Sequence, residues 1–235
     1  MLPDDLVARL RESPFLRSLG QPEVEELARS ARVRRVPPRE RLWASGDPIP
    51  GPVFIISGLV RVYHDDDPAR PTTITMFWPG ELVAPSILQQ EEWITHAVAV
   101  APVVQVTLNR AAFFAACARN SMLAYHLLHD LTVAFYRRYA WEWDLRLVTL
   151  TRRLLMMFGR MADELGTPTP KGILLDFPLT HEIVAGLAWV KRDHARRVLN
   201  QLAGEGLLVD CPRFRWLIPD RERLGPRHRL PPAHM

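Results

Sequence analysis

A short basic segment near the C-terminus carries the side chains best suited to chemistry in this chain. Lys191, Arg192, Arg196 and Arg197 surround a single acid, Asp193. The planar guanidinium of arginine matches phosphates and the O6 and N7 atoms of guanine, and a carboxylate accepts a hydrogen bond from the amino group of cytosine. These residues therefore predict non-covalent recognition of a nucleic acid.

Two short helices with a turn between them are predicted to position this segment. The first is capped by Thr180 and ends at Ala188, and the second runs from Arg192 to Ala203. Trp189-Val190-Lys191 forms the turn. The apolar residues of the second helix recur at helical spacing, which leaves the basic side chains on the opposite face. Together the two helices predict a helix-turn-helix, whose second helix presents its N-terminal residues to the major groove.

A β-hairpin is predicted directly after the second helix. Gly204-Glu205-Gly206 ends the helix, and strands over 207–211 and 214–218 turn at Pro212-Arg213. A hairpin in this position is a wing. Its arginines, Arg213 and Arg215, are candidates for phosphate contacts.

The formal charge of +4 is concentrated in the last quarter of the chain. Residues 171–235 contain 11 Lys and Arg against 7 Asp and Glu, whereas the first 170 residues contain 19 of each sign. This partition favours a polyanion-binding C-terminal part on a neutral N-terminal body. The alternative is a small helical cap with a solvated charged face.

Short β-branched runs separated by turn residues fill the chain between Val33 and Leu108. Strands at this spacing predict an antiparallel sandwich or roll of roughly 75 residues. Asn109 follows as the N-cap of a helix that begins at Arg110.

A long helix is predicted from Ser121 to about Val148, because this stretch contains no Gly or Pro. Apolar residues recur along it at spacings of three and four: Leu123, Leu127, Leu128, Leu131, Ala134, Phe135, Tyr139 and Leu145. At a rise of 1.5 Å per residue it would be roughly 40 Å long, more than a small domain needs to cover its own core. We expect it to pair with a copy of itself; the alternative is a helix that lies wholly on its own barrel.

The expected fold class is therefore α+β. We expect an antiparallel sandwich or roll with flanking helices over 1–120, a dimerisation helix over 121–148, a winged helix-turn-helix over 149–224 and a disordered tail over 225–235. The sequence starts without a secretory signal and has no apolar stretch long enough to span a membrane. Its two cysteines make no disulfide framework, so we expect a cytoplasmic protein.

The order of these elements resembles the Crp/Fnr family of bacterial transcription regulators over nearly the full chain. The resemblance rests on the stretches Gly46-Asp47-Pro48, Phe54 to Tyr63, Pro79 to Leu82, Leu179 to Asp193, and Arg197 to Leu207. It implies that residues 1–120 form a β-roll (double-stranded β-helix) that serves as a sensor domain. It further implies a homodimer that binds a palindromic site in double-stranded DNA, with RNA polymerase as a further partner. It also implies that Arg192 and Arg197 donate to bases while Asp193 accepts from cytosine.

This sequence departs from the family pattern at four positions of the helix-turn-helix. Asp193 stands where the family has glutamate, and Arg196 where the family often has a small residue. Lys191 replaces the Ser or Thr cap of the recognition helix, and Trp189 replaces the glycine of the turn. A bulky residue at that glycine position requires either a different turn or a strained one.

The effector pocket implied by the family falls on Glu81, Thr95 and His96. Gly80-Glu81 matches the family's ribose-binding Gly-Glu, but Thr95 stands where the arginine that clamps a cyclic phosphate is expected. Between Glu81 and Asn109 there is no Lys or Arg. A buried phosphate needs a charge-assisted partner, so we do not expect cAMP to bind in the family's usual mode unless Arg61 or a partner subunit supplies it.

Other effectors and functions are judged on the same grounds. An iron–sulfur cluster is not expected, because no cysteine precedes Cys117, and a haem has possible axial ligands without diagnostic spacing. A neutral effector could instead bind in an apolar pocket, and the alternative is that the same residues only form the core of the roll. These residues are Phe77, Trp78, Val83, Ile87, Trp93 and Ile94. With only His64 and His96 in the roll, an enzyme is not expected. A metal- or haem-binding roll with weak or lost DNA recognition is the alternative function.

Overall fold

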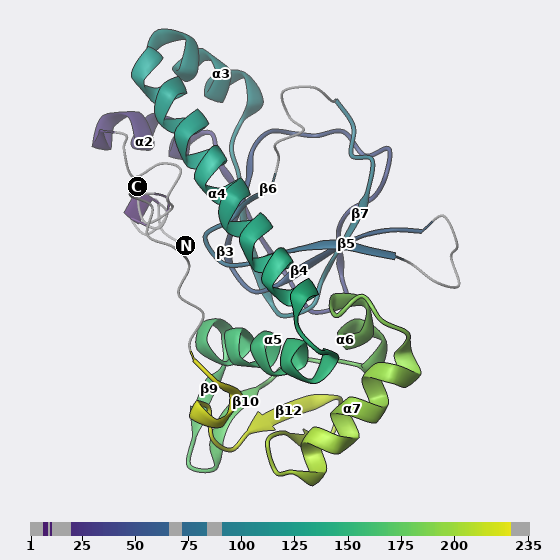
Figure 1. Cartoon of the computed structure of the whole chain (residues 1–235). Coiled ribbons are helices and arrows are strands. Elements are labelled where there is room, and N and C mark those ends of the chain that lie inside the picture. The colour runs from purple at the N-terminus through teal and green to yellow at the C-terminus, as the bar shows by residue number, and fades with distance from the viewer. Residues whose placement is uncertain (1–6, 9, 11–19, 66–71, 84–90, 227–235) are drawn as a thin grey trace. The chain divides into compact units, whose positions relative to one another are not determined.

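The computed structural model describes residues 7–8, 10, 20–65, 72–83 and 91–226 (Figure 1). The chain divides into two compact units, residues 1–136 and 137–235. Predictions that concern Ile87 and most of the expected tail lie outside the described residues, as do the side chains of Leu123, Leu127 and Ala134.

Two four-stranded antiparallel sheets form the body of the first unit (Figure 1). The strand orders are β1-β8-β3-β6 and β2-β7-β4-β5. This confirms the predicted antiparallel β-roll. The strands are β1 Arg32–Val36, β2 Arg41–Trp43, β3 Val53–Ser57, β4 Val60–His64, β5 Thr72–Phe77, β6 Leu82–Val83, β7 His96–Ala99 and β8 Val103–Thr107.

Alternating side chains of these strands make the core of the roll. Val60 and Val62 of β4 pair with Ala99 and Ala97 of β7, and all four are buried in one apolar cluster. The turn between β3 and β4 depends on Gly58, whose φ is +92°. A Cβ there would lie 2.1 Å from the carbonyl oxygen of Pro102, so no other residue fits.

Two helices cover one face of the first sheet. α2 (Gln21–Arg29) and α3 (Arg110–Arg119) contribute to a second apolar cluster with Phe54 of β3 and Val106 of β8. The Asn109 side chain accepts a hydrogen bond from the backbone of Ala112 at 2.9 Å, as its predicted role as N-cap requires.

The long helix α4 (Ser121–Leu147) ends within one residue of its predicted boundary and is shared between the two units. Its apolar residues have different fates. Leu131 packs on the second cluster of the first unit, whereas Trp141 and Leu145 are buried in the second unit. A further set is exposed in the single chain, each by 49% or more: Met122, Tyr125, Leu128, Phe135, Tyr136, Tyr139, Trp143 and Leu147. At 100° per residue, this set falls on one side of the helix.

The second unit combines helices with a four-stranded antiparallel sheet of order β11-β12-β10-β9. Its elements are α5 Leu150–Leu165, β9 Thr167–Thr169, β10 Gly172–Leu175, α6 His181–Leu187, α7 Arg192–Gly204, β11 Val209–Cys211, β12 Arg215–Ile218 and the 3-10 turn η2 Glu222–Leu224. The helix-turn-helix and the wing are where the sequence predicted them. The hairpin of β9 and β10 is a further element, which was not among the predicted ones.

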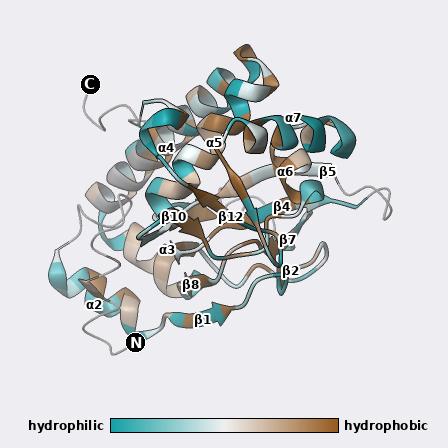
Figure 2. Cartoon of the chain, turned by 90° about the horizontal axis from the view of Figure 1, so that it is seen from below, coloured by the Kyte–Doolittle hydropathy of each residue, from teal (hydrophilic) through white to brown (hydrophobic). Residues whose placement is uncertain are grey.

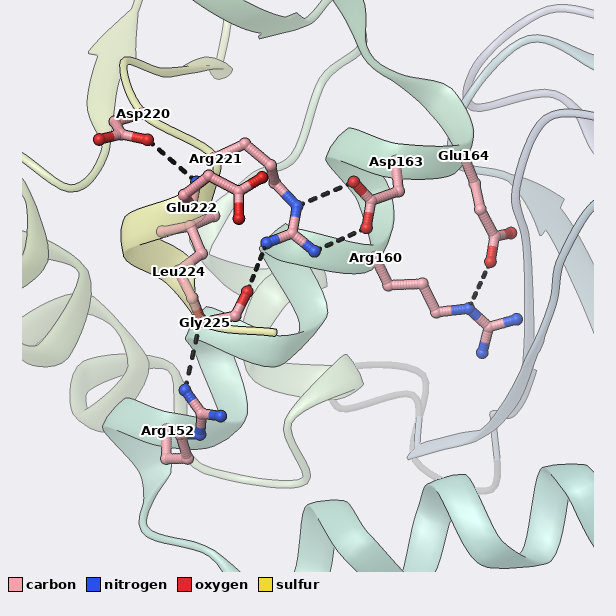
Figure 3. Close-up of polar contacts among 9 residues, drawn as sticks. All are labelled: Arg152, Arg160, Asp163, Glu164, Asp220, Arg221, Glu222, Leu224 and Gly225. Carbon is pink, nitrogen blue, oxygen red and sulfur yellow. Dashed lines mark hydrogen bonds and ion pairs between the residues drawn. The ribbon is translucent and has the colours of Figure 1, made fainter. Parts of the chain in front are cut away.

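A partly buried ion pair fastens the end of the second unit to α5 (Figure 3). Arg221 donates from Nε and Nη2 to the two carboxylate oxygens of Asp163, at 2.9 and 2.6 Å. Its Nη1 donates to the carbonyl of Gly225 at 2.9 Å. A Cβ on Gly159 of α5 would lie 3.2 Å from the guanidinium carbon of Arg221, so this glycine makes room for the pair.

Candidate nucleic-acid interface

The first helix of the helix-turn-helix is set by its cap and its buried face. The Thr180 hydroxyl accepts a hydrogen bond from the backbone of Ile183 at 3.2 Å and so begins α6, as predicted. Val184 and Leu187 of α6 and Ala195 and Leu199 of α7 are buried. Burial of these faces holds α7 against α6 and turns the polar side of α7 outward.

The polar side of α7 carries the predicted recognition residues. Arg192, Asp193, Arg196 and Arg197 are all exposed, and Figure 2 shows the hydrophilic colouring of this helix. Among the residues that the structure describes, no hydrogen bond or ion pair engages the three guanidinium groups. They are therefore available to a ligand.

Two further side chains, which the sequence analysis did not select, lie on the same helix. His194 is exposed in the first turn, and Asn200 is exposed further along. At 100° per residue, Asn200 follows Arg192 and Arg196 in one row, beside the row of Asp193 and Arg197. This helical period is the signal that would have selected Asn200 from the sequence.

The turn before α7 keeps the left-handed backbone that a glycine normally provides. Trp189 has a φ of +53°. Its N–H donates to the carbonyl of Gly186 at 3.3 Å, and the N–H of Val190 donates to that of Ala185 at 3.0 Å. This pair of bonds is the Schellman motif that ends many helices. The usual turn of the motif is therefore present, and Trp189 is strained in it. The left-handed backbone costs a non-glycine residue about 1–2 kcal/mol.

Lys191 occupies the N-cap position of α7. Its side chain makes no capping hydrogen bond, while its carbonyl accepts from the N–H groups of His194 and Ala195, at 3.0 and 3.1 Å. The exposed ammonium therefore stands at the positive end of a helix, a placement that a nearby anion would stabilise.

The wing turn is tied to the start of α6. Phe214 accepts a hydrogen bond at its carbonyl from the N–H of Leu179 at 2.8 Å, and the indole of Trp216 donates to the Leu179 carbonyl at 3.0 Å. Arg213 and Phe214 are exposed and have φ values of +65° and +60°. Arg215, the other arginine proposed for phosphate, is instead engaged by Asp176 at 3.0 Å.

In the roll, each of the three predicted effector residues contacts other parts of the protein. A carboxylate oxygen of Glu81 accepts from the backbone of Trp78 at 3.1 Å and closes the turn between β5 and β6. The Thr95 hydroxyl accepts from the indole of Trp43 at 3.5 Å. His96 pairs through Nε2 with Asp65 at 2.7 Å. None of these three contacts joins Glu81 to either of the other two.

The other candidates in the roll are Arg61, which already has contacts within the protein, and apolar residues, most of which are buried. Arg61 is 8% exposed; its Nε donates to the Thr73 hydroxyl at 2.8 Å, and its guanidinium lies over the ring of Tyr63. Four residues of the suggested apolar pocket are buried, Phe77, Trp78, Val83 and Trp93, whereas Ile94 is exposed. Over the residues that can be described, no group of three His, Cys, Asp or Glu side chains is placed to hold a metal ion. Likewise, no helix among them is long and apolar enough to cross a membrane.

Two family models match the two parts of the chain. The cyclic nucleotide-binding domain matches residues 33–120, and the Crp-like helix-turn-helix domain matches residues 150–226. The chain belongs to the Crp/Fnr family of transcription regulators. The matches cover the roll and the winged helix-turn-helix of this Crp/Fnr protein, and they make it a DNA-binding regulator with a cyclic-nucleotide-binding-like domain.

Solved structures of Crp/Fnr proteins share this fold. A CRP-family regulator from Thermus thermophilus has a TM-score of 0.68 at 23% identity, covering 81% of this chain and 94% of its own. FixK2 from Bradyrhizobium japonicum has a TM-score of 0.64 at 16% identity, covering 83% and 95%. The c-di-GMP-responsive regulator CLP from Xanthomonas campestris has a TM-score of 0.65 at 19% identity, covering 86% and 100%. Among curated proteins, no match to the sequence was found.

A substitution at the wing tests whether this Crp/Fnr protein contacts phosphate with Arg213. Arg213→Asn keeps the backbone, because asparagine tolerates the left-handed region that Arg213 occupies. We expect affinity to fall by a similar factor for every duplex, and the slope of log affinity against log salt to decrease by about 1 for each lost phosphate contact. Fluorescence anisotropy at several salt concentrations measures both. An unchanged slope would remove Arg213 from the interface.

Proposed function

We propose that this regulator is a cytoplasmic homodimer that reads a palindromic DNA site with α7. The observation that carries the proposal is the exposed face of α7, where three arginines and one aspartate lie free of intramolecular partners in the described part of the chain. Elsewhere in the second unit, the buried arginines Arg160 and Arg221 form ion pairs with carboxylates and have a structural role. The arginines of α7 have no such use.

The proposed contacts follow from the chemistry of each side chain. Arg192 and Arg197 donate to guanine N7 and O6, and Asp193 accepts from a cytosine amino group. Arg196 extends the basic row and gives this regulator a half-site different from the usual one of the family. Lys191, Thr180 and Arg213 contact phosphates; a phosphate beside Lys191 would remove the unfavourable meeting of its charge with the helix N-terminus.

Self-association through α4 is the second part of the proposal. Eight large apolar side chains exposed on one side of this helix favour burial against a second copy. A two-fold axis along such a pair would present two α7 helices to successive major grooves about 34 Å apart. RNA polymerase is the further partner that this class of regulator implies.

For the roll, we propose an effector that is not cAMP bound in the family's usual mode. Thr95 stands at the position of the phosphate clamp and contacts Trp43, and His96 contacts Asp65. Neither residue supplies a fixed positive charge, which a buried cyclic phosphate requires. Arg61 is already bonded to Thr73 and stacked on Tyr63. We infer an effector that needs no anion clamp.

Selection from a random duplex library with the full-length protein tests the DNA-binding proposal. We expect enrichment of palindromes with half-sites one helical turn apart. A control library incubated with the Arg192→Ala, Arg197→Ala protein should yield no such enrichment. Binding that shows no sequence preference at physiological salt would overturn sequence-specific recognition.

The dimer is tested by placing charge on the exposed face of α4. Phe135→Glu with Tyr139→Glu should give a monomer with unchanged helix content, because both side chains are exposed in the single chain. Sedimentation velocity and far-UV circular dichroism measure these two properties. Asp144→Ala lies off that face and is the matched control. A charged variant that remains a dimer would place the interface elsewhere.

A further inference from the structure

A single arginine joins the C-terminal ends of two helices in the second unit. Arg153, in the first turn of α5, donates from Nε to the carbonyl of Leu145 at 2.6 Å and from Nη1 to that of Ala188 at 2.7 Å. Its Nη2 lies 3.4 Å from the carbonyl of Val148. The last carbonyls of a helix lack intrahelical donors and carry partial negative charge. The guanidinium therefore holds the ends of α4 and α6 together.

A second arginine reaches the next residue of the same turn. The guanidinium of Arg146, in the last turn of α4, lies 5.5 Å from the ring centre of Trp189. Trp189 directly follows Ala188, whose carbonyl Arg153 holds. Partial burial, and then the nearby charge of Arg146, lower the pKa of Arg153 from the usual arginine value. Both cations thus converge on the turn between α6 and α7.

Trp189 combines a strained backbone with a contact to Arg146. A non-glycine residue keeps a left-handed backbone only where its surroundings determine it. A glycine at this position would satisfy the Schellman motif without strain, but it could not contact Arg146. The tryptophan therefore adds to the turn a link to α4 that the motif itself does not need.

The position of Arg146 on α4 relates this link to the exposed apolar side chains. Leu128, Phe135, Tyr139 and Arg146 follow one another at intervals of 7, 4 and 7 residues, so Arg146 lies on the same side of the helix as the other three. Whatever packs on that side of α4 lies next to the guanidinium that contacts Trp189.

We propose that Arg146, Arg153 and Trp189 form a positioning clamp, which sets the helix-turn-helix against the end of α4 so that DNA affinity depends on the contact between Arg146 and Trp189. The inference rests on the proposed DNA-binding function. All three are positioning residues, and none touches DNA. Changes in the packing of α4 reach α7 through this contact.

The test compares Trp189→Leu, Trp189→Gly, Arg146→Gln and the double variant Arg146→Gln, Trp189→Leu on one duplex selected by the wild-type protein. We expect each single variant to bind about fivefold or more weakly, a usual size for coupling between sites. The double variant should bind no more weakly than the weaker single one, because both changes break the same contact. Trp189→Gly relieves the strained backbone and provides a folded variant if Trp189→Leu unfolds.

Two further readouts separate positioning from direct contact and from simple unfolding. The salt slope of the Trp189 variants should equal that of the wild type, because no phosphate contact is lost. Their thermal midpoints should not fall in proportion to affinity. Unchanged affinity, a smaller salt slope, additive single effects or a parallel loss of stability would each overturn the clamp. If the wild-type protein selects no duplex, the proposed function fails instead.

Discussion

Arg197→Ala is expected to weaken binding to the selected palindrome by about 1–3 kcal/mol for each half-site and to relax the preference at one base pair. The expectation follows from the exposed guanidinium of Arg197 on α7, which no intramolecular hydrogen bond or ion pair engages in the described part of the chain. A dimer carries the change twice, so the effect on affinity is among the largest predicted here. Anisotropy titrations against the selected site, and against sites substituted at each position, measure both consequences.

Arg197→Lys is the matched control for this prediction. Lysine keeps the positive charge but lacks the planar fork that donates to guanine N7 and O6 together. If Arg197 reads a base, the lysine variant loses the preference almost as fully as the alanine variant. If Arg197 only contacts phosphate, the lysine variant should keep nearly wild-type affinity and sequence preference, and base recognition by Arg197 would be refuted.

Arg221→Met is expected to lower the free energy of unfolding of the second unit by about 3 kcal/mol. The side chain of Arg221 is 7% exposed and that of Asp163 25%, and two hydrogen bonds join them (Figure 3). Removing only the cation leaves the partly buried carboxylate of Asp163 without its partner, which costs more than the pair contributes. Denaturant unfolding of the full chain, followed by near-UV circular dichroism, to which buried Trp216 contributes, measures the loss.

The double variant Arg221→Met, Asp163→Asn distinguishes a stranded charge from lost packing. When both charges are removed, no ionised group is left unpaired, and a substantial part of the stability should return. A double variant as unstable as the single one would indicate that the guanidinium acts mainly by packing on Gly159, which lies directly against it. A single variant with wild-type stability would contradict the prediction.

The sequence predicted the parts of this protein whose signals are local. Alternating β-branched residues placed the roll, and a capping threonine with a helical period placed α6 and α7. Trp189 was predicted to be unusual from the resemblance to the Crp/Fnr family, whose pattern has glycine at that position. The absence of a cation between Glu81 and Asn109 was likewise readable without coordinates.

The features that the sequence did not predict depend on partners far apart in the chain. Arg221 and Asp163 are separated by 58 residues, and Arg215 and Asp176 by 39, so no spacing rule joins them. The short strand β9 contains Pro168 and reads as a turn until its pairing with β10 is known. The attachment of the end of α4 to α5, where Arg153 bonds the Leu145 carbonyl and Arg160 lies over Trp141, is equally non-local.

The sharing of α4 between the two units determines where a hybrid of two such regulators can be joined. The boundary between the units falls inside an uninterrupted helix. Trp141 and Leu145, which follow the boundary, are buried residues of the second unit. A hybrid joined after Leu147, at the connection to α5, would need a foreign helix to supply Trp141, Leu145 and Arg146 in the correct rotational phase. The segment that must be transferred intact to carry DNA recognition into a hybrid protein therefore begins near Arg137, ahead of the connection to α5.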